Sequence, residues 1–286
     1  MDNRIHREVI GGHLLVIGGA EDKYNERRIL RKFLELTGTD GGETNVLIVP
    51  VASDFPEFAA DIYVQAFRRL GIANPRVLRA TSRQDVFAAD ADALFDSVNG
   101  VFITGGDQMR LVSLLGGTKF AQKLRQVATE TNVVLAGTSS GAAGMSTSMI
   151  VRGDATPHPH KNSVRLSPGL GFLKNIIIDQ HFTERGRISR LITAVAYNPY
   201  NLGIGIDENT AIILDNEGVL EVFGEGSVTV VDGSQITYNE IAEVDDFQSF
   251  SVCGVQLHIL GNGLIYDYFG RTPLQPPNEF LLPDIE

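Results

Sequence analysis

A serine framed by two glycines is the first candidate for chemistry in this sequence. Residues 137–141 read Gly-Thr-Ser-Ser-Gly and directly follow the apolar run Val-Val-Leu-Ala. This G-x-S-x-G pattern is typical of a nucleophile elbow, a strand-to-helix turn whose glycines let backbones pass closely and whose serine is projected outward. Of the two serines, only Ser139 stands at the centre of this pattern. For Ser140 to be central, positions 138 and 142 would have to be glycine, and they are Thr138 and Ala142. The alternative is an ordinary Gly/Ser-rich turn, so the assignment depends on finding partners for the serine.

A serine hydroxyl needs a neighbouring base, and histidine is the usual one. Of the six histidines, His181 follows the apolar run NIIIDQ and precedes the helical pattern TERGRISRLITAVAY. Functional groups gather at the carboxyl ends of strands in open α/β sheets, where Ser139 and His181 are both expected. His158 and His160 lie in a proline-rich loop and, with His181, form the less favoured alternative of a metal site. We expect no metal and no cofactor.

The base needs a carboxylate to orient it. Asp207 and Glu208 stand at the end of a buried strand expected in NLGIGIDENTAIIL, and the residues alone do not choose between them. Asp179 is a rival, but it precedes His181 by two residues within a strand. The resulting order of serine, histidine and acid differs from the serine, acid and histidine order of α/β-hydrolases.

An oxyanion hole requires backbone N–H groups beside the nucleophile. The sequence FITGGDQ follows an expected strand and leaves amides exposed after its glycines. We expect the N–H of Gly106 or Asp107 to act together with that of Ser140, the residue after the nucleophile.

Strands that alternate with helices must position these groups. Apolar runs predict strands at 13–18, 44–52, 75–80, 100–106, 132–137, 175–180 and 201–214. Amphipathic patterns predict helices at 25–36, 56–71, 83–98, 107–117, 119–131 and 183–197. This order predicts a mainly parallel sheet covered on both faces. After about residue 207, the turns DNEG, GEG and DGS predict antiparallel hairpins, which we interpret as a β-rich extension (207–286) of one catalytic domain spanning residues 1–286.

The composition limits the possible classes of protein. The 286 residues carry a net charge of −11, which disfavours a general nucleic-acid or anionic-membrane binder. Cys253 is the single cysteine, so no internal disulfide can form and a reducing compartment is expected. The start, MDNRIHREVIGG, is charged and lacks the apolar stretch of a signal peptide. We therefore expect a cytoplasmic protein.

Five motifs together resemble one family of serine peptidases. They are VIGGAEDK, VFITGGDQ, GTSSGAA, DQHFTERGRISRL and GIGIDENTA. In this order they are similar to those of the family that contains the cyanophycinases and the aspartyl dipeptidases (dipeptidase E). The resemblance implies a flavodoxin-like fold related to class I glutamine amidotransferases, and a homodimer. It also implies hydrolysis of cyanophycin, a poly-aspartate chain with one arginine on each side chain, to β-aspartyl-arginine dipeptides from the chain end.

The resemblance also implies residue roles. Ser139 corresponds to the nucleophile, His181 to the base and Glu208, rather than Asp207, to the acid. The implied substrate pocket comprises Gln108, Asp179, Gln180, Arg185, Arg187 and Arg190. Ser140 departs from the family, which often has alanine there.

The charges of these residues suit such a substrate. Arginines pair with carboxylates in bidentate fashion, so we expect Arg185, Arg187 and Arg190 to hold carboxylates of the polymer and acidic groups such as Asp179 to hold its guanidinium. Two alternatives stay open: an aspartyl dipeptidase acting on short Asp-X peptides, and a polymer-binding protein with a vestigial site. A glutamine amidotransferase is excluded, because it would need cysteine at the elbow.

Overall fold

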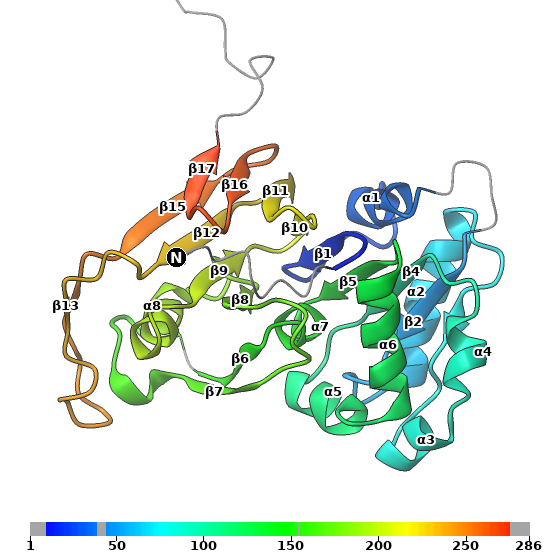
Figure 1. The fold of residues 1–286 in the computed structure, drawn as a ribbon, viewed down its shortest axis with the longest axis horizontal. Coiled ribbons are helices and arrows are strands. Elements are labelled where there is room, and N and C mark those ends of the chain that lie inside the picture. The colour runs from blue at the N-terminus through cyan, green and yellow to red at the C-terminus, as the bar shows by residue number, and fades with distance from the viewer. Residues whose placement is uncertain (1–9, 39–43, 154, 275–286) are drawn as a thin grey trace, which may run out of the picture.

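A nine-stranded sheet forms the centre of the molecule. The structure is a computed structural model that describes residues 10–38, 44–153 and 155–274. The strand order is β17-β16-β11-β10-β1-β5-β4-β2-β3 (Figure 1). The parallel half contains β1 (Leu14–Ile17), β2 (Val46–Val49), β3 (Arg76–Val77), β4 (Gly100–Ile103) and β5 (Val134–Thr138). The antiparallel half contains β10 (Thr210–Leu214), β11 (Val219–Gly224), β16 (Ile265–Asp267) and β17 (Thr272–Leu274).

Helices cover both faces of the parallel half. On one face, the Phe102 ring packs against Phe33 and Phe67, with ring centroids 5.5 and 5.6 Å apart. These two rings come from α1 (Arg28–Leu36) and α2 (Pro56–Arg69). Ile103, one residue further, belongs to the core on the other face. That face is covered by α3 (Arg83–Ala88), α4 (Ala91–Phe95), α5 (Gln108–Leu115) and α6 (Lys119–Glu130). The α/β fold class predicted from the sequence is confirmed.

A second sheet lies beside the first (Figure 1). Its four strands have the order β15-β12-β9-β8, and β8 and β9 are parallel. The strands are β8 (Ile176–Gln180), β9 (Leu202–Ile206), β12 (Val228–Asp232) and β15 (Gln256–Leu260). Helix α8 (Ile188–Tyr197) connects β8 to β9 and packs on β9 and β12. This parallel pair has its own carboxyl ends, which carry two of the candidate residues.

The run 201–214 is two strands rather than the single strand that the sequence predicts. β9 belongs to the second sheet and β10 to the first, and residues 207–209 carry the chain from one sheet to the other. Both strands are buried and apolar, so the hydrophobic pattern continues across the change of sheet. Backbone hydrogen bonds from Gly18 N–H to the Thr210 carbonyl and from Asn209 N–H to the Gly19 carbonyl, both 2.9 Å, fix the crossing beside β1.

Two predicted helices also differ from the structure. Residues 83–98 form α3 and α4 rather than one helix, because Asp90 caps a new helix by accepting the Ala93 N–H (3.1 Å). Helix α8 begins at Ile188 rather than at residue 183, and the intervening segment contains Gly186 in the left-handed region (φ 57°). That segment consequently turns back toward β8.

The remaining elements are short. They are α7 (Ser140–Gly144), β6 (Ser148–Arg152), the 3-10 turn Lys161–Ser163, β7 (Arg165–Pro168), β13 (Tyr238–Asn239) and β14 (Val252–Cys253). Within the described residues, no helix is long and apolar enough to cross a membrane. The charged start lies largely outside the described residues, in positions 1–9. A single catalytic domain with a β-rich C-terminal part stays a prediction.

Candidate active site

Strand β5 enters helix α7 through Ser139. This residue has φ 52° and ψ −118°, angles that a residue with a Cβ atom rarely adopts. Its N–H donates to the Ile17 carbonyl of β1, and its carbonyl accepts the Ala143 N–H of α7, both at 3.0 Å. These two bonds hold the strained turn between the strand and the helix. Ser139 is thus placed in the sharp turn that the G-x-S-x-G pattern predicts.

The two glycines of the motif are required by close backbone approaches. A Cβ atom at Gly137 would lie 2.7 Å from the Gly141 carbonyl oxygen. A Cβ atom at Gly141 would lie 2.8 Å from the Thr104 carbonyl oxygen. Real Cβ contacts essentially never fall below 3.0 Å, so neither position tolerates a side chain. The structure confirms this reason for the glycines.

His181 follows strand β8 and faces the serine. Its Nε2 atom lies 2.8 Å from Ser139 Oγ, within hydrogen-bond distance. The His181 N–H donates to the Gly18 carbonyl (2.9 Å), which ties the residue to the end of β1. Its ring lies against Gly19, where a Cβ atom would be only 2.6 Å from Nε2. The motif VIGGAEDK therefore has a physical role, because Gly19 leaves space for the imidazole.

The two acidic candidates have different partners. Glu208 Oε1 lies 2.6 Å from His181 Nδ1. Asp207 instead accepts the backbone and hydroxyl groups of Thr183 (3.0 and 2.7 Å) and of Ser227 (2.9 and 2.8 Å). Burial opposes ionisation of Asp207, but these hydrogen bonds outweigh it and lower its pKa. Glu208 is therefore the carboxylate in contact with the imidazole, while Asp207 links the segment after β8 to the start of β12.

The protonation of His181 suits a general base. Burial is the main influence on its pKa and lowers it from the ordinary value of 6.5. The hydrogen bond to Glu208 opposes this effect, whereas the positive charges of Arg185 and Arg187 add to it. With Nδ1–H donated to Glu208, a neutral imidazole has its lone pair on Nε2, toward Ser139. The three side chains can therefore pass a proton from the hydroxyl to the ring.

Ser140 has a structural position. Its side chain is buried, and its Oγ donates to the Gly106 carbonyl (2.5 Å). Its N–H belongs to the first residue of α7, where a helix leaves the amide without an intrahelical acceptor. Asp107 donates its N–H to the Ala52 carbonyl (2.8 Å), which favours Gly106 of the two residues predicted for the oxyanion hole. Among the described residues no hydrogen bond engages the Gly106 N–H, which leaves Gly106 and Ser140 as candidate donors.

Three predicted substrate-binding residues are instead bonded to one another. Asp179 is fully buried and accepts Arg190 Nε (2.7 Å) and a second bond from Arg190 Nη2. Arg187 Nη1 lies 3.4 Å from Asp179 Oδ1 and donates to the Gln180 carbonyl. Arg190 also donates to the Gly153 carbonyl (2.6 Å). Asp179 is thus not free for a substrate guanidinium, nor are these arginines exposed to a substrate carboxylate.

The late start of α8 explains this difference. The sequence predicts all three arginines at the start of the helix after His181, but the turn before Ile188 carries Arg187 back over β8. Arg185 stays exposed, and its side chain has no hydrogen bond to another described residue. Gln180 is buried, and Gln108 donates its amide to the Ile150 carbonyl (2.7 Å). Of the predicted arginines, Arg185 is the one available to an incoming ligand.

One buried carboxylate beside the elbow was missed at the sequence level. Glu21 is 2% exposed and accepts hydrogen bonds from Thr138 Oγ1 (2.6 Å) and Tyr63 OH (2.5 Å). Lys23 Nζ lies 3.2 Å from the same carboxylate. Thr138 directly precedes Ser139. The hydrogen bond to Glu21 therefore fixes the residue next to the proposed nucleophile. The position of Glu21 in the motif VIGGAEDK could have marked it as a candidate. The sequence alone does not indicate its hydrogen-bond partners, Thr138 and Tyr63.

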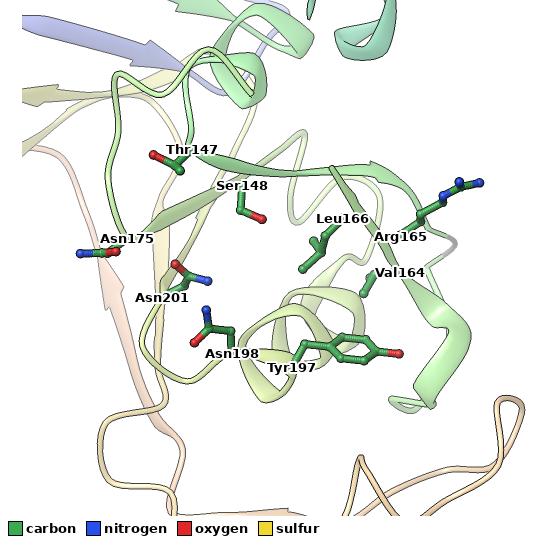
Figure 2. A pocket seen from close by; sticks show the side chains of 9 residues that line it. All are labelled: Thr147, Ser148, Val164, Arg165, Leu166, Asn175, Tyr197, Asn198 and Asn201. Carbon is green, nitrogen blue, oxygen red and sulfur yellow. The ribbon is translucent and has the colours of Figure 1, made fainter. Parts of the chain in front are cut away.

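A cavity of about 520 Å³ lies at the other end of the second sheet. Its lining includes Asn175 and Asn201, which directly precede β8 and β9, whereas His181 and Glu208 follow these strands. Figure 2 shows the Asn198 and Asn201 side chains facing one another there, with Arg165 directed away. Ser139, His181 and Glu208 do not line this cavity. Within the described residues, no three His, Cys, Asp or Glu side chains gather as a metal site requires.

Curated relatives cover nearly the whole chain. Proteins named cyanophycinase from Nostoc sp. and Synechococcus elongatus are each 38% identical to it, over 261 and 256 residues. These alignments cover 91% and 90% of this chain, and 87% and 79% of the relatives. A cyanophycinase from Geminocystis herdmanii is 36% identical over 270 residues, which cover 94% of this chain and 97% of the relative.

A solved structure shares the fold. The crystal structure of a peptidase from an acI-B1 Actinobacterium superposes with a TM-score of 0.68 at 20% identity, covering 92% of this chain and 99% of that one. The sequence pattern of peptidase family S51 matches residues 14–222, a range that contains the elbow, the histidine and both acidic candidates. The chain therefore belongs to peptidase family S51.

Proposed function

We propose that this protein is a cyanophycinase, a serine-type exopeptidase that hydrolyses cyanophycin to β-aspartyl-arginine dipeptides. The observation that carries the proposal is the hydrogen-bonded series from Ser139 Oγ through the His181 ring to Glu208. The relatives named cyanophycinase support the choice of substrate, since their sequences are 36–38% identical to this one over at least nine-tenths of this chain.

In the first half of the reaction, Ser139 Oγ attacks the scissile carbonyl carbon and its proton passes to His181 Nε2. Glu208 accepts the Nδ1–H and stabilises the imidazolium that forms. The carbonyl oxygen becomes an oxyanion, for which the N–H groups of Gly106 and Ser140 are the proposed donors. The imidazolium then gives its proton to the leaving amine, the C–N bond breaks, and an acyl-enzyme remains on Ser139.

In the second half, water replaces the leaving amine. His181, now neutral again, takes a proton from the water as it attacks the acyl carbon. Collapse of the second tetrahedral intermediate breaks the bond to Ser139 Oγ, which recovers its proton from the imidazolium. The products carry a new carboxylate and a new amine, and the enzyme returns to its starting state.

Arg185 is proposed to hold a carboxylate of the polymer. It is exposed on the segment after His181, and guanidinium groups pair with carboxylates in bidentate geometry. We no longer propose that Arg187 and Arg190 hold carboxylates of the polymer. With Asp179 they form a buried cluster that positions this segment, and two cations against one anion leave a positive potential beside the base.

The test is incubation of the purified protein with insoluble cyanophycin, followed by mass spectrometry of the soluble products. Release of β-aspartyl-arginine by the wild type, and not by Ser139→Ala, is expected. Cleavage of Asp-X dipeptides without release from cyanophycin would assign an aspartyl dipeptidase instead. Binding of the polymer without any soluble product from the wild type would indicate a binding protein.

Two further features belong to the proposal. A cytoplasmic location agrees with the single cysteine, and a homodimer is implied by the family. Light scattering of the purified protein would measure its mass, and a value near 31.1 kDa, that of one chain, would contradict the dimer.

A further inference from the structure

Two strongly exposed phenylalanines lie close to the proposed nucleophile. Phe55 is 75% exposed and Phe58 70% exposed. Phe55 is the residue directly before α2 and Phe58 lies in its first turn, so both are at the same end of the helix. Two rings left in water forgo the free energy that burial of aromatic surface provides. Contact with a ligand would recover it, so the pair is a candidate binding surface.

A series of close backbone approaches places this surface beside Ser139. A Cβ atom at Gly105 would lie 3.2 Å from the Cβ of Ser139, and one at Gly106 would lie 2.6 Å from the Ser53 nitrogen. The Ser53 Oγ in turn accepts the Phe55 N–H (3.0 Å). In the sheet, β2 is two strands from β5, which corresponds to about 10 Å. Phe55 and Phe58 follow β2 as Ser139 follows β5, so these residues come after the carboxyl ends of strands in the same parallel half of the sheet.

The charge next to the rings is negative. Asp54 is exposed, and its side chain has no hydrogen bond to another described residue. Glu57 lies between the rings in sequence, and its carboxylate pairs with Arg79. On the other side of Ser139, the exposed Arg185 supplies a positive charge. The surroundings of the nucleophile are therefore polarised, with carboxylate and aromatic groups toward β2 and a guanidinium toward β8.

We propose that Phe55 and Phe58 form an aromatic wall which, together with the adjacent carboxylate of Asp54, binds the guanidinium side chain of the substrate. This inference rests on the proposed function and names its specificity residues. The methylenes of a substrate arginine would lie on the rings, its planar guanidinium would stack on a ring face, and Asp54 would balance its charge. Arg185 would hold the carboxylate of the same repeat. The wall thereby distinguishes a polymer bearing arginine from plain poly-aspartate.

The test compares two synthetic substrates, a trimer of β-aspartyl-arginine and the same trimer with lysine in place of arginine. The wild type should prefer the arginine trimer, because a guanidinium stacks on aromatic faces better than an ammonium does. Phe55→Ala and Phe58→Ala should each raise KM for the arginine trimer about two- to five-fold with kcat nearly unchanged. The preference over the lysine trimer should shrink in both variants, and Phe55→Trp should restore it.

Phe87→Ala is the matched control. Phe87 is also an exposed phenylalanine, but it lies on α3, which covers the opposite face of the sheet from α2, and is already stacked on Arg83, at 5.1 Å. Its replacement should leave both KM values unchanged. Equal KM values in wild type, Phe55→Ala and Phe58→Ala would overturn the wall. So would an equal loss on both trimers, or a change of oligomeric state in these two variants, which would identify the rings as an interface between two copies.

A binding measurement separates this inference from the proposed function. Calorimetry of the arginine trimer with Ser139→Ala, and with Ser139→Ala combined with Phe55→Ala, needs no turnover. Weaker binding by the double variant supports the wall even if the wild type releases no dipeptide, in which case only the proposed reaction fails. Equal binding by the two proteins, or no binding by either, overturns the wall even where the wild type is active.

Discussion

Replacement of Gly19 by alanine tests whether the His181 ring can occupy only one position. Gly19 has φ 106°, and the imidazole lies directly against it. An added Cβ atom would meet the ring at 2.4 Å from Cε1 and 2.6 Å from Nε2, whereas ordinary van der Waals contact begins at 3.4 Å. For Cε1, the nearest atom, the ring would have to move by the difference, about 1.0 Å. The same movement would disturb the 2.8 Å contact between Nε2 and Ser139 Oγ.

The expected loss follows from this displacement. A misplacement of about 1 Å in a catalytic group costs about 10²-fold in rate. We therefore expect kcat for Gly19→Ala to fall about 10²-fold. KM should change much less, because the added methyl group meets the general base, His181, and not the proposed substrate-binding side. The left-handed backbone adds about 1–3 kcal/mol of strain, which should lower the free energy of unfolding.

Gly71→Ala is the control for backbone strain. Gly71 has a similar φ of 99°, but nothing lies within 4 Å of a Cβ atom placed there. It should lose stability without loss of kcat. The assay is release of β-aspartyl-arginine, together with the rate at which Ser139 reacts with a small acylating reagent. A folded Gly19→Ala protein with wild-type kcat and normal acylation would refute the reasoning.

Three other experiments test the proposed roles of Ser139, His181 and Glu208. Ser139→Ala should lower turnover by up to about 10⁶-fold, while Ser140→Ala, which removes one buried hydrogen bond, should retain most activity and lose about 1 kcal/mol of stability; the opposite ranking would assign the nucleophile to Ser140. Glu208→Gln should reduce kcat far more than Asp207→Asn, whose main effect should be a lower melting temperature, and equal kcat values would contradict the assignment. Because the triad imidazole has a lowered pKa and must be neutral to act, kcat/KM should rise with pH along a limb below about 6.5. Arg185→Gln removes a positive charge that lowers this pKa, so the limb should move to higher pH; an unchanged or downward-shifted limb would contradict the stated cause.

Most of the triad geometry could be anticipated from local patterns. The elbow is encoded within five residues, and its two glycines are explained by contacts that any such turn makes. His181 could be placed because an apolar strand directly precedes it and functional groups gather at the carboxyl ends of such strands, although its strand β8 belongs to the second sheet and not to that of Ser139. Spacing did not distinguish Asp207 from Glu208, since adjacent residues at a strand end have the same hydrophobic surroundings. Their hydrogen-bond partners lie in segments far away along the chain.

The arginines show where sequence patterns fail. Arg187 and Arg190 are three residues apart, a spacing that predicts a shared helix face. In the structure both contact the buried Asp179, because the chain turns between His181 and Ile188 before the helix begins. A charge pattern gives the neighbours of a residue on its own helix. Such a pattern does not reveal a buried carboxylate on a neighbouring strand, here Asp179 on β8.

The triad is assembled where the two sheets meet, and this junction explains why Gly18 and Gly19 stand together. Ser139 follows β5 of the central sheet, whereas His181 follows β8 of the second sheet and Glu208 lies where the chain passes between the two. The Gly18 carbonyl accepts the His181 N–H, and the Gly19 carbonyl accepts the Asn209 N–H, both at 2.9 Å. A Cβ atom at Gly18 would also lie 2.6 Å from the Ile206 carbonyl oxygen of β9. The two glycines thus bring both sheets close enough for the His181 ring to contact Ser139 through Nε2 and Glu208 through Nδ1.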